Sequence, residues 1–329
     1  MGGLISDWKT FHDDVVTNFS RDEPLFLARI GGSDTDAMID YLSFKTRDRD
    51  ALYSHIQRHL HVVEKFNGFY DLTDDKYSSY FRYLNELHDC YLSMKMATFV
   101  HTYFVSTFFP TAIHERFFTA DVPNRQTMEK VVGRIVNANG FIGAYPYSFI
   151  ESTIAHKYTL FQALSKLLVG KTVLVLCPFE ESIRANFRNR DLFFKHDYVY
   201  PDFHLETVNT PITYGGIEES SYPNTNWFET VEALKGQIRN VKFDIALMAC
   251  GSYAMPLGGF IERELKKKAI YVGGVLQLYF GIMGQRYENE FFLNQINREY
   301  FIQPIEREKY LSLIPTGDTA IRDAFGAYF

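Results

Sequence analysis

A cation, two glycines and two carboxylates follow one another near the start of the chain. Arg29 precedes Gly31 and Gly32, and Asp34 and Asp36 come directly after them. Glycines let a backbone approach a phosphate closely, and an arginine beside them can donate hydrogen bonds to it. The two aspartates are spaced so that both could meet one divalent ion, Mn²⁺ or Mg²⁺, that bridges a diphosphate. The segment therefore predicts a diphosphate site with a metal at Asp34 and Asp36.

Two carboxylates and a hydroxyl form a second candidate group, Glu180, Glu181 and Ser182, directly after Pro178 and Phe179. These residues stand at the expected start of a helix, where backbone N–H groups and Ser182 could bind an anion. Glu180 or Glu181 could take a proton from an acceptor hydroxyl as a general base. The same residue types also cap helices, and that structural role explains them equally well.

Two further turns are marked by glycines. The first lacks the Gly-x-Ser-x-Gly frame of a nucleophile elbow, which disfavours a serine hydrolase. In the second, closely spaced glycines interrupt a helix, so its backbone is expected to bend around a ligand or a neighbouring element. The candidate binding residues of the two turns are Gly251, Ser252, Tyr253, Gly273, Gly274, Gln277 and Arg286.

The elements around these turns alternate between strands and helices. Amphipathic segments at 227–238 and 255–267 predict helices. Short apolar runs predict buried strands at 24–28, 171–176, 204–208, 243–250 and 269–272. This alternation indicates a Rossmann-like, doubly wound and mostly parallel sheet, in which ligands bind outside the carboxyl ends of the strands. All the candidate turns fall at such ends.

We expect one catalytic α/β domain over residues 1–329, with a Rossmann-like core at 166–290 and a helical insertion at 45–115. Aromatic-rich helices are expected at 77–92 and 94–109, followed by a helix at 127–138 and a strand at 141–144.

One pair of histidines has the spacing of a metal site. His55 and His59 fall at i and i+4 of an expected helix, which is a zinc-ligand spacing. No third ligand is identifiable, so surface or packing roles are favoured.

Composition narrows the class of protein. The net charge of −6 gives no support to nucleic-acid binding. Three cysteines, Cys90, Cys177 and Cys250, are too scattered for a disulfide framework and favour a reducing, cytoplasmic setting. No apolar run reaches the roughly 20 residues that a membrane span requires, so no transmembrane segment is expected. The C-terminal segment is expected to pack on the body or on a partner subunit, which leaves a homo-oligomer open.

Four runs of the sequence carry a resemblance to a known family. They are Phe149–Ser152, the strand and turn at 170–183, the run 243–257 and the glycine-rich run 273–284. In this order they resemble a family of glycosyltransferases found in polysaccharide and capsule biosynthesis and in large DNA viruses. That family is similar in pattern to the GT-D type of glycosyltransferase fold. The Arg29 turn extends the likeness to the N-terminal part.

The resemblance implies transfer of a sugar from a nucleotide-sugar donor to a glycan, polysaccharide or other acceptor, with a divalent metal at the diphosphate. Arg29, Gly31 and Gly32 would then hold the diphosphate. Two departures weaken the transfer of residue roles: Asp34 stands where the family often has a glutamate, and Cys177 where a histidine is frequent.

Two other classes of function stay open. One is an inactive glycan- or nucleotide-binding module on the same fold. The other is a different nucleotide-cofactor enzyme, such as a methyltransferase or dehydrogenase, although no Gly-x-Gly-x-x-Gly follows an expected strand and no Walker lysine motif is present.

Overall fold

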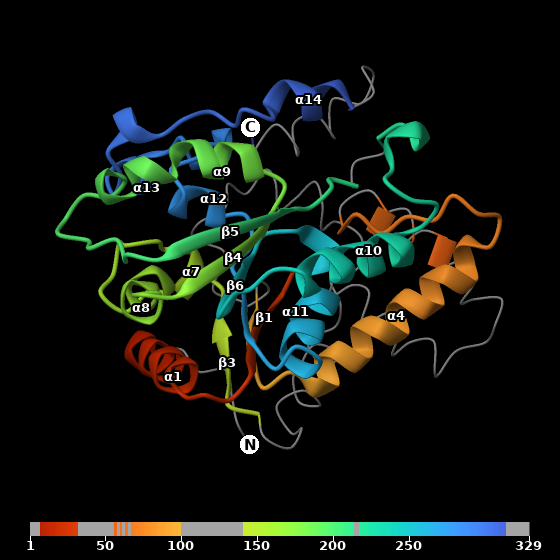
Figure 1. Ribbon diagram of the computed structural model, residues 1–329, viewed down its shortest axis with the longest axis horizontal. Coiled ribbons are helices and arrows are strands. Elements are labelled where there is room, and N and C mark those ends of the chain that lie inside the picture. Colours follow the sequence, from red (N-terminus) through yellow and green to blue (C-terminus); the bar gives the residue numbers. More distant parts are fainter. Residues whose placement is uncertain are drawn as a thin grey trace.

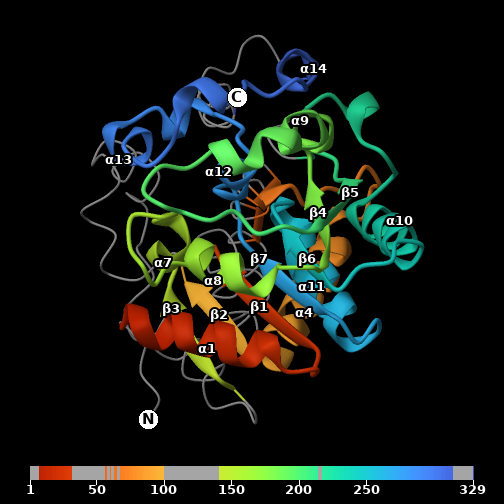
Figure 2. The ribbon, with the colours of Figure 1, turned by 60° about the vertical axis from the view of Figure 1, so that its left-hand side comes forward.

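The computed structural model describes residues 7–31, 56–57, 60, 63–64, 67–99, 141–213, 217–313 and 329. In these residues seven strands form one sheet in the order β3-β2-β1-β7-β6-β4-β5, and every neighbouring pair is parallel. The strands are β1 Leu25–Ile30, β2 Met96–Phe99, β3 Gly143–Pro146, β4 Thr172–Cys177, β5 His204–Asn209, β6 Ile245–Met248 and β7 Lys268–Tyr271. Figure 2 shows β1 and β7 in the middle of this order.

Helices cover both faces of the sheet, which confirms the expected doubly wound, Rossmann-like fold (Figure 1). One face packs on α1 Trp8–Ser20, α7 Ser148–Glu151, α8 Leu160–Leu167 and α9 Glu180–Asn186. The other packs on α4 Lys76–Ser93, α10 Trp227–Arg239 and α11 Ala254–Arg263. The C-terminal part adds α12 Leu276–Tyr279, α13 Glu290–Leu293 and α14 Arg307–Ser312. Short 3₁₀ helices lie at Phe187–Leu192, Glu219–Ser221, Gly251–Tyr253, Gln285–Tyr287 and Arg298–Tyr300.

Alternate residues of the strands enter the two cores. In β1, Leu25 and Leu27 belong to the first core, whereas Phe26 and Ala28 belong to the second. Successive side chains of a strand point to opposite faces, so a sheet covered on both sides needs unbroken apolar strands. This requirement explains why short apolar runs identify β1, β4, β6 and β7 in the sequence.

Five of the described helices, α1, α4, α8, α10 and α13, begin at residues whose side chains cap them. Asn226 accepts a hydrogen bond from the backbone N–H of Glu229 at 3.0 Å and starts α10. Asp7 accepts from the backbone N–H of Thr10 at 2.8 Å and starts α1. Each cap satisfies a backbone donor that has no partner within the helix.

The prediction of a helix at 94–109 is wrong for residues 96–99. Residues Met96–Phe99 instead form β2, which pairs with β1 on one side and β3 on the other. The run Met-Ala-Thr-Phe is too short for periodicity to separate a buried strand from a buried helix. Residues 100–109, and the expected helix at 127–138, lie outside the described residues.

Several boundaries move by a few residues. The strand expected at 141–144 is β3 at 143–146, and the helix expected at 255–267 ends at Arg263.

The C-terminal part packs on the body of its own chain: the Tyr310 hydroxyl donates to the carbonyl oxygen of Pro178 at 2.8 Å. Of the helices in the described residues, none combines the length and apolar character needed to cross a bilayer.

Candidate functional site

Arg29 lies at the carboxyl end of β1, an interior strand of the sheet between β2 and β7. Its guanidinium carbon is 4.4 Å from the centroid of the Tyr147 ring and 5.4 Å from that of Tyr271. Tyr147 follows β3, and Tyr271 is the last residue of β7. A cation is attracted to an aromatic face at such distances. The two rings therefore fix Arg29 where ligands bind in sheets of this kind.

Hydrogen bonds hold both tyrosines. The Tyr147 hydroxyl donates to the carbonyl oxygen of Val272 at 3.0 Å. The Tyr271 hydroxyl donates to the carbonyl oxygen of Gly251 at 3.2 Å, and it accepts a long contact of 3.4 Å from Nη1 of Arg29. These bonds connect the ends of β1, β3, β6 and β7. Four strand ends therefore share one rigid polar cluster.

Gly273 makes room for this cluster. Its φ is +79°, a conformation that residues with a side chain rarely adopt. A Cβ added there would lie 2.8 Å from the Tyr147 hydroxyl oxygen and 3.1 Å from Nε of Arg29. The predicted turn at Gly273 and Gly274 thus passes directly against the predicted arginine.

Glu151, the last residue of α7, places a carboxylate beside Arg286. Its Oε1 is 3.5 Å from Nη2 of Arg286, and the two side chains are 21% and 26% exposed. Burial raises the pKa of Glu151, and the charges of Arg286 and Arg29 oppose that rise. Arg29 and Arg286, both predicted as binding residues, therefore act on the same carboxylate.

Glu151 and the two tyrosines were not among the predicted site residues. In the sequence, Glu151 stands out only as part of the family-like run Phe149–Ser152. An acid inside an otherwise apolar run, just after an expected strand, is the signal that could have found it. Tyr147 and Tyr271 carry no such local signal in a chain with 22 tyrosines.

The predicted group at 180–182 lies at the end of β4 and is engaged with other elements. Ser182 is fully buried: its backbone N–H donates to Oε1 of Glu306 at 3.1 Å, and its hydroxyl donates to the same carboxylate. Oε1 of Glu180 accepts hydrogen bonds from Thr207 and from Nε of Arg184. Glu181 is exposed in the first turn of α9. Their roles in binding and proton transfer stay predictions.

Ser252 and Tyr253, in the turn after β6, also bond within the body of the protein. The indole N–H of Trp227 donates to the Ser252 hydroxyl at 2.8 Å, and the hydroxyls of Tyr253 and Thr213 are 2.6 Å apart. Both residues are buried. Gly251, in contrast, joins the Arg29 cluster through its carbonyl oxygen.

The glycine-rich run bends as the sequence indicates. The four-residue helix α12 lies between Gly273 and Gly281, whose φ angles are +79° and +69°. Gln277 belongs to α12 and is 1% exposed, and its backbone oxygen accepts from the N–H of Ile282 at 2.9 Å. The run therefore brings Gly273 to the site and turns back toward Arg286.

The predicted metal ligands Asp34 and Asp36, together with Gly32, lie outside the described residues, as do His55 and His59. Gly31, the last described residue after β1, is buried. The described part of the chain has no group of three or more His, Cys, Asp or Glu that could hold an ion. The metal therefore stays a prediction.

The cysteines are free and buried in the described residues. Cys177 ends β4, and burial raises the pKa of its thiol to about 12. Burial also raises the pKa of Cys250 well above its usual value. At neutral pH both are thiols, which are poor nucleophiles and metal ligands.

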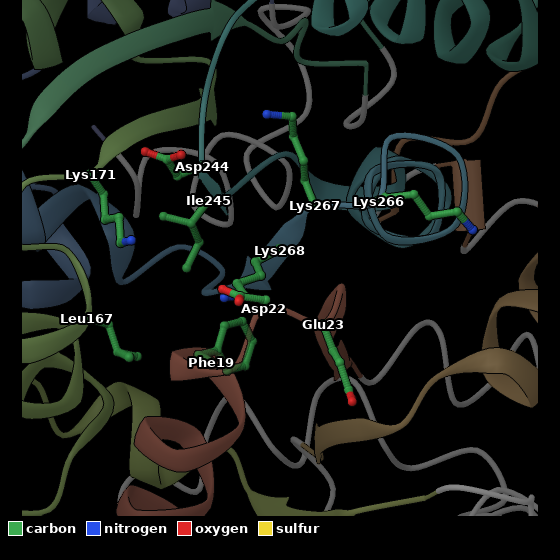
Figure 3. Close-up of a pocket in the computed structure, with 10 residues that line it drawn as sticks. All are labelled: Phe19, Asp22, Glu23, Leu167, Lys171, Asp244, Ile245, Lys266, Lys267 and Lys268. Atoms are coloured by element: carbon green, nitrogen blue, oxygen red, sulfur yellow. The ribbon is translucent and has the colours of Figure 1, made fainter.

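A cavity of about 270 Å³ lies at the opposite edge of the sheet. Lys171, Asp244 and Lys268 lie at the amino ends of β4, β6 and β7, and Phe19 and Leu167 add apolar surface (Figure 3). The side chain of Lys266 points away from the other groups. Ligands of such sheets bind at the carboxyl ends, so we do not assign the active site to this cavity.

Fold and site together define an α/β protein with an arginine-rich, aromatic-supported cluster at the carboxyl edge of a parallel sheet. No model of a known protein family matches the chain, and no curated protein sequence matches it. Solved structures match by fold.

One is a structure presented as a new glycosyltransferase (DUF1792) from Streptococcus sanguinis. It is 10% identical, the match covers 98% of this chain and 97% of that one, and the TM-score is 0.50. Another is a domain of unknown function 1792 reported to have a distinct glycosyltransferase fold, at 12% identity, coverage of 93% and 96%, and a TM-score of 0.45. The likeness at a TM-score of 0.50 confirms the expected resemblance in fold.

Proposed function

We propose that this protein is a glycosyltransferase that moves a sugar from a nucleotide-sugar donor to a glycan, polysaccharide or other acceptor. The observation that carries the proposal is Arg29, held by Tyr147 and Tyr271 against Gly273 at the carboxyl end of the interior strand β1. The likeness in fold to a protein called a glycosyltransferase supports the same reaction class.

In this proposal the leaving group is a nucleoside diphosphate. The Arg29 and Arg286 guanidinium groups bind its phosphates, because planar guanidinium groups donate paired hydrogen bonds to phosphate oxygens. Their charges stabilise the negative charge that develops as the bond to the sugar breaks. Gly273 and Gly274 let the backbone approach the ligand closely.

A divalent ion, Mn²⁺ or Mg²⁺, belongs to the proposal through Asp34 and Asp36. It would neutralise part of the charge on the leaving diphosphate. The acceptor hydroxyl loses its proton to a carboxylate, with Glu180 and Glu181 as candidates. Glu181 is the more accessible of the two, since Glu180 already accepts from Thr207 and Arg184.

The test is a thermal-shift and calorimetric series with UDP-sugars and GDP-sugars, each with and without Mn²⁺. A ligand that binds the folded state raises the melting temperature by an amount that depends on its concentration and Kd. We expect a shift with one nucleotide series, increased by the metal, and release of that nucleoside diphosphate when an acceptor is added. Folded protein that binds no nucleotide sugar would contradict the proposal.

A further inference from the structure

Among the described residues, Glu151 is an acidic group on which the charges of both arginines of the candidate site act. Oε1 of Glu151 is 3.5 Å from Nη2 of Arg286, and the charge of Arg29 also acts on this carboxylate. The three groups come from three separate elements: β1, α7 and the turn Gln285–Tyr287. Glu151 is 21% exposed, so water screens these charges only in part.

The sum of the charges favours an anion only weakly while Glu151 is ionised. Two guanidinium groups and one carboxylate leave a single net positive charge on this trio. A diphosphate diester carries two negative charges, and its phosphates would have to share the arginines with the carboxylate. Like charges brought close together favour the neutral form of the group that can take up a proton. Arginine keeps its proton, so Glu151 is the member of the trio that can change its charge.

We propose that Arg29, Glu151 and Arg286 form a proton-linked diphosphate site, in which Glu151 takes up one proton from solvent when the diphosphate of the donor binds. This inference rests on the glycosyltransferase function proposed above and adds a regulation of the same site. Glu151 is a positioning residue here, since it acts through the two arginines.

The environment of Glu151 suits this role. Its burial already raises its pKa, and the opposing contributions come from Arg286 and Arg29, the charged groups shown to act on it. When a diphosphate binds both arginines, its negative charge offsets their stabilisation of the ionised carboxylate. The pKa of Glu151 therefore rises further. Because linkage is reciprocal, protonation of Glu151 must strengthen donor binding by the same factor.

The sign of the pH dependence follows. Donor affinity falls as the pH rises from the pKa of Glu151 in the free protein to its higher pKa in the complex. The steepest possible slope is about tenfold in Kd per pH unit, because one proton is taken up. Glu151→Gln removes the negative charge permanently, so it should bind as tightly as the wild type does at low pH and lose this dependence.

The experiment is titration calorimetry with UDP-glucose and GDP-mannose, each with and without Mg²⁺, in two buffers of different ionisation enthalpy at each of several pH values. These diphosphate diesters do not titrate near neutral pH, so proton uptake belongs to the protein. We expect a measurable fraction of one proton for the wild type and none for Glu151→Gln. Glu264→Gln is the matched control, because Glu264 also pairs with an arginine, Arg239, at 3.1 Å but lies between the end of α11 and the amino end of β7. It should keep the wild-type uptake.

The outcomes separate the two proposals. A wild type that binds neither sugar nucleotide counts against the transferase proposal itself. The proton linkage is overturned if the wild type binds without taking up a proton. It is also overturned if Glu151→Gln takes up as many protons as the wild type. Either result leaves the transferase proposal standing. If Glu151→Gln does not fold, the wild-type buffer comparison still decides, together with Arg286→Ala. Arg286→Ala removes a phosphate-binding group and should therefore bind more weakly, and because Arg286 no longer favours the ionised form of Glu151, the proton uptake per ligand bound should be smaller than in the wild type.

Discussion

The guanidinium group of Arg29 lies against the face of the Tyr147 ring, 4.4 Å from its centroid, while the hydroxyl of the same tyrosine is bonded to the backbone after β7. A single aromatic side chain thus orients the cation of one strand end against the backbone of another. A cation on an aromatic face contributes about 0.5–2 kcal/mol, depending on its exposure to water.

Arg29→Ala should weaken donor binding at least about tenfold, since a charge-assisted hydrogen bond contributes roughly 1.5–3 kcal/mol. The variant should still fold but lose about 0.5–2 kcal/mol of stability, because its contacts with the Tyr147 and Tyr271 rings are lost. Tyr147→Phe, which keeps the ring and loses the bond to Val272, should have a smaller effect. Calorimetric Kd values measure both, and unchanged affinity in Arg29→Ala would remove Arg29 from the site.

Gly273→Ala should destabilise the protein by about 1–3 kcal/mol and weaken donor binding. The left-handed conformation itself costs roughly 1–2 kcal/mol for a residue with a Cβ, and the added carbon would lie 2.8 Å from the Tyr147 hydroxyl. Urea unfolding measures the change.

Gly236→Ala is the control for that substitution. Gly236 lies inside α10 with no neighbouring atom within 4 Å of an added Cβ. This variant should be more stable than the wild type by about 0.5–1 kcal/mol, since alanine favours helix. Equal effects of the two substitutions would show that the geometry at Gly273 is unimportant.

Ser182→Ala should lower the free energy of unfolding by about 1–3 kcal/mol. The substitution leaves the buried Glu306 carboxylate without the hydroxyl that donates to it. Ser312→Ala, at an exposed site on α14 where the hydroxyl donates only to the Lys309 carbonyl oxygen, should change stability by less than about 0.5 kcal/mol. A Ser182→Ala protein of wild-type stability would argue against a structural role of this hydroxyl.

Glu262→Gln should stabilise the protein increasingly as the pH rises. Glu262 is 5% exposed, and burial raises its pKa although Lys95 lies 3.7 Å away and opposes the rise. The folded state therefore holds the proton more tightly than the unfolded state. The wild type is most stable, with respect to this group, below the unfolded pKa, and loses stability as the pH rises to the folded pKa.

Unfolding by urea at a series of pH values checks this difference between Glu262→Gln and the wild type. Glu264→Gln, which changes an exposed carboxylate paired with Arg239, is the control variant. A difference that does not change with pH would contradict the assignment to Glu262.

The predictable part of the fold is the part encoded locally. The β4–α9 unit follows from an apolar run, a proline and two acids in a row, each of which has a local physical meaning. Strand β2 was missed because Met96–Phe99 gains its strand conformation from β1 and β3 on either side. Local sequence does not contain that information.

The same distinction applies to the site. Arg29 and Gly273 could be selected because glycine turns at strand ends are visible in sequence, and the structure brings them into contact. Tyr271, Tyr147 and Glu151 could not be selected, because their roles come from partners far away along the chain. Ser182 illustrates the converse: its hydroxyl bonds with Glu306, 124 residues later, which no local pattern reveals.

The bonds that build the cluster span long stretches of chain: 242 residues between Arg29 and Tyr271, 125 between Tyr147 and Val272, and 135 between Glu151 and Arg286. Closing loops of that length costs chain entropy before any contact compensates for it, so such contacts form late in folding. During synthesis Arg29 emerges long before β7 and stays without its final neighbours until nearly the whole sheet exists. We therefore expect the proposed donor binding at this edge to require the completed sheet, so an N-terminal fragment that ends before β7 should not bind the donor.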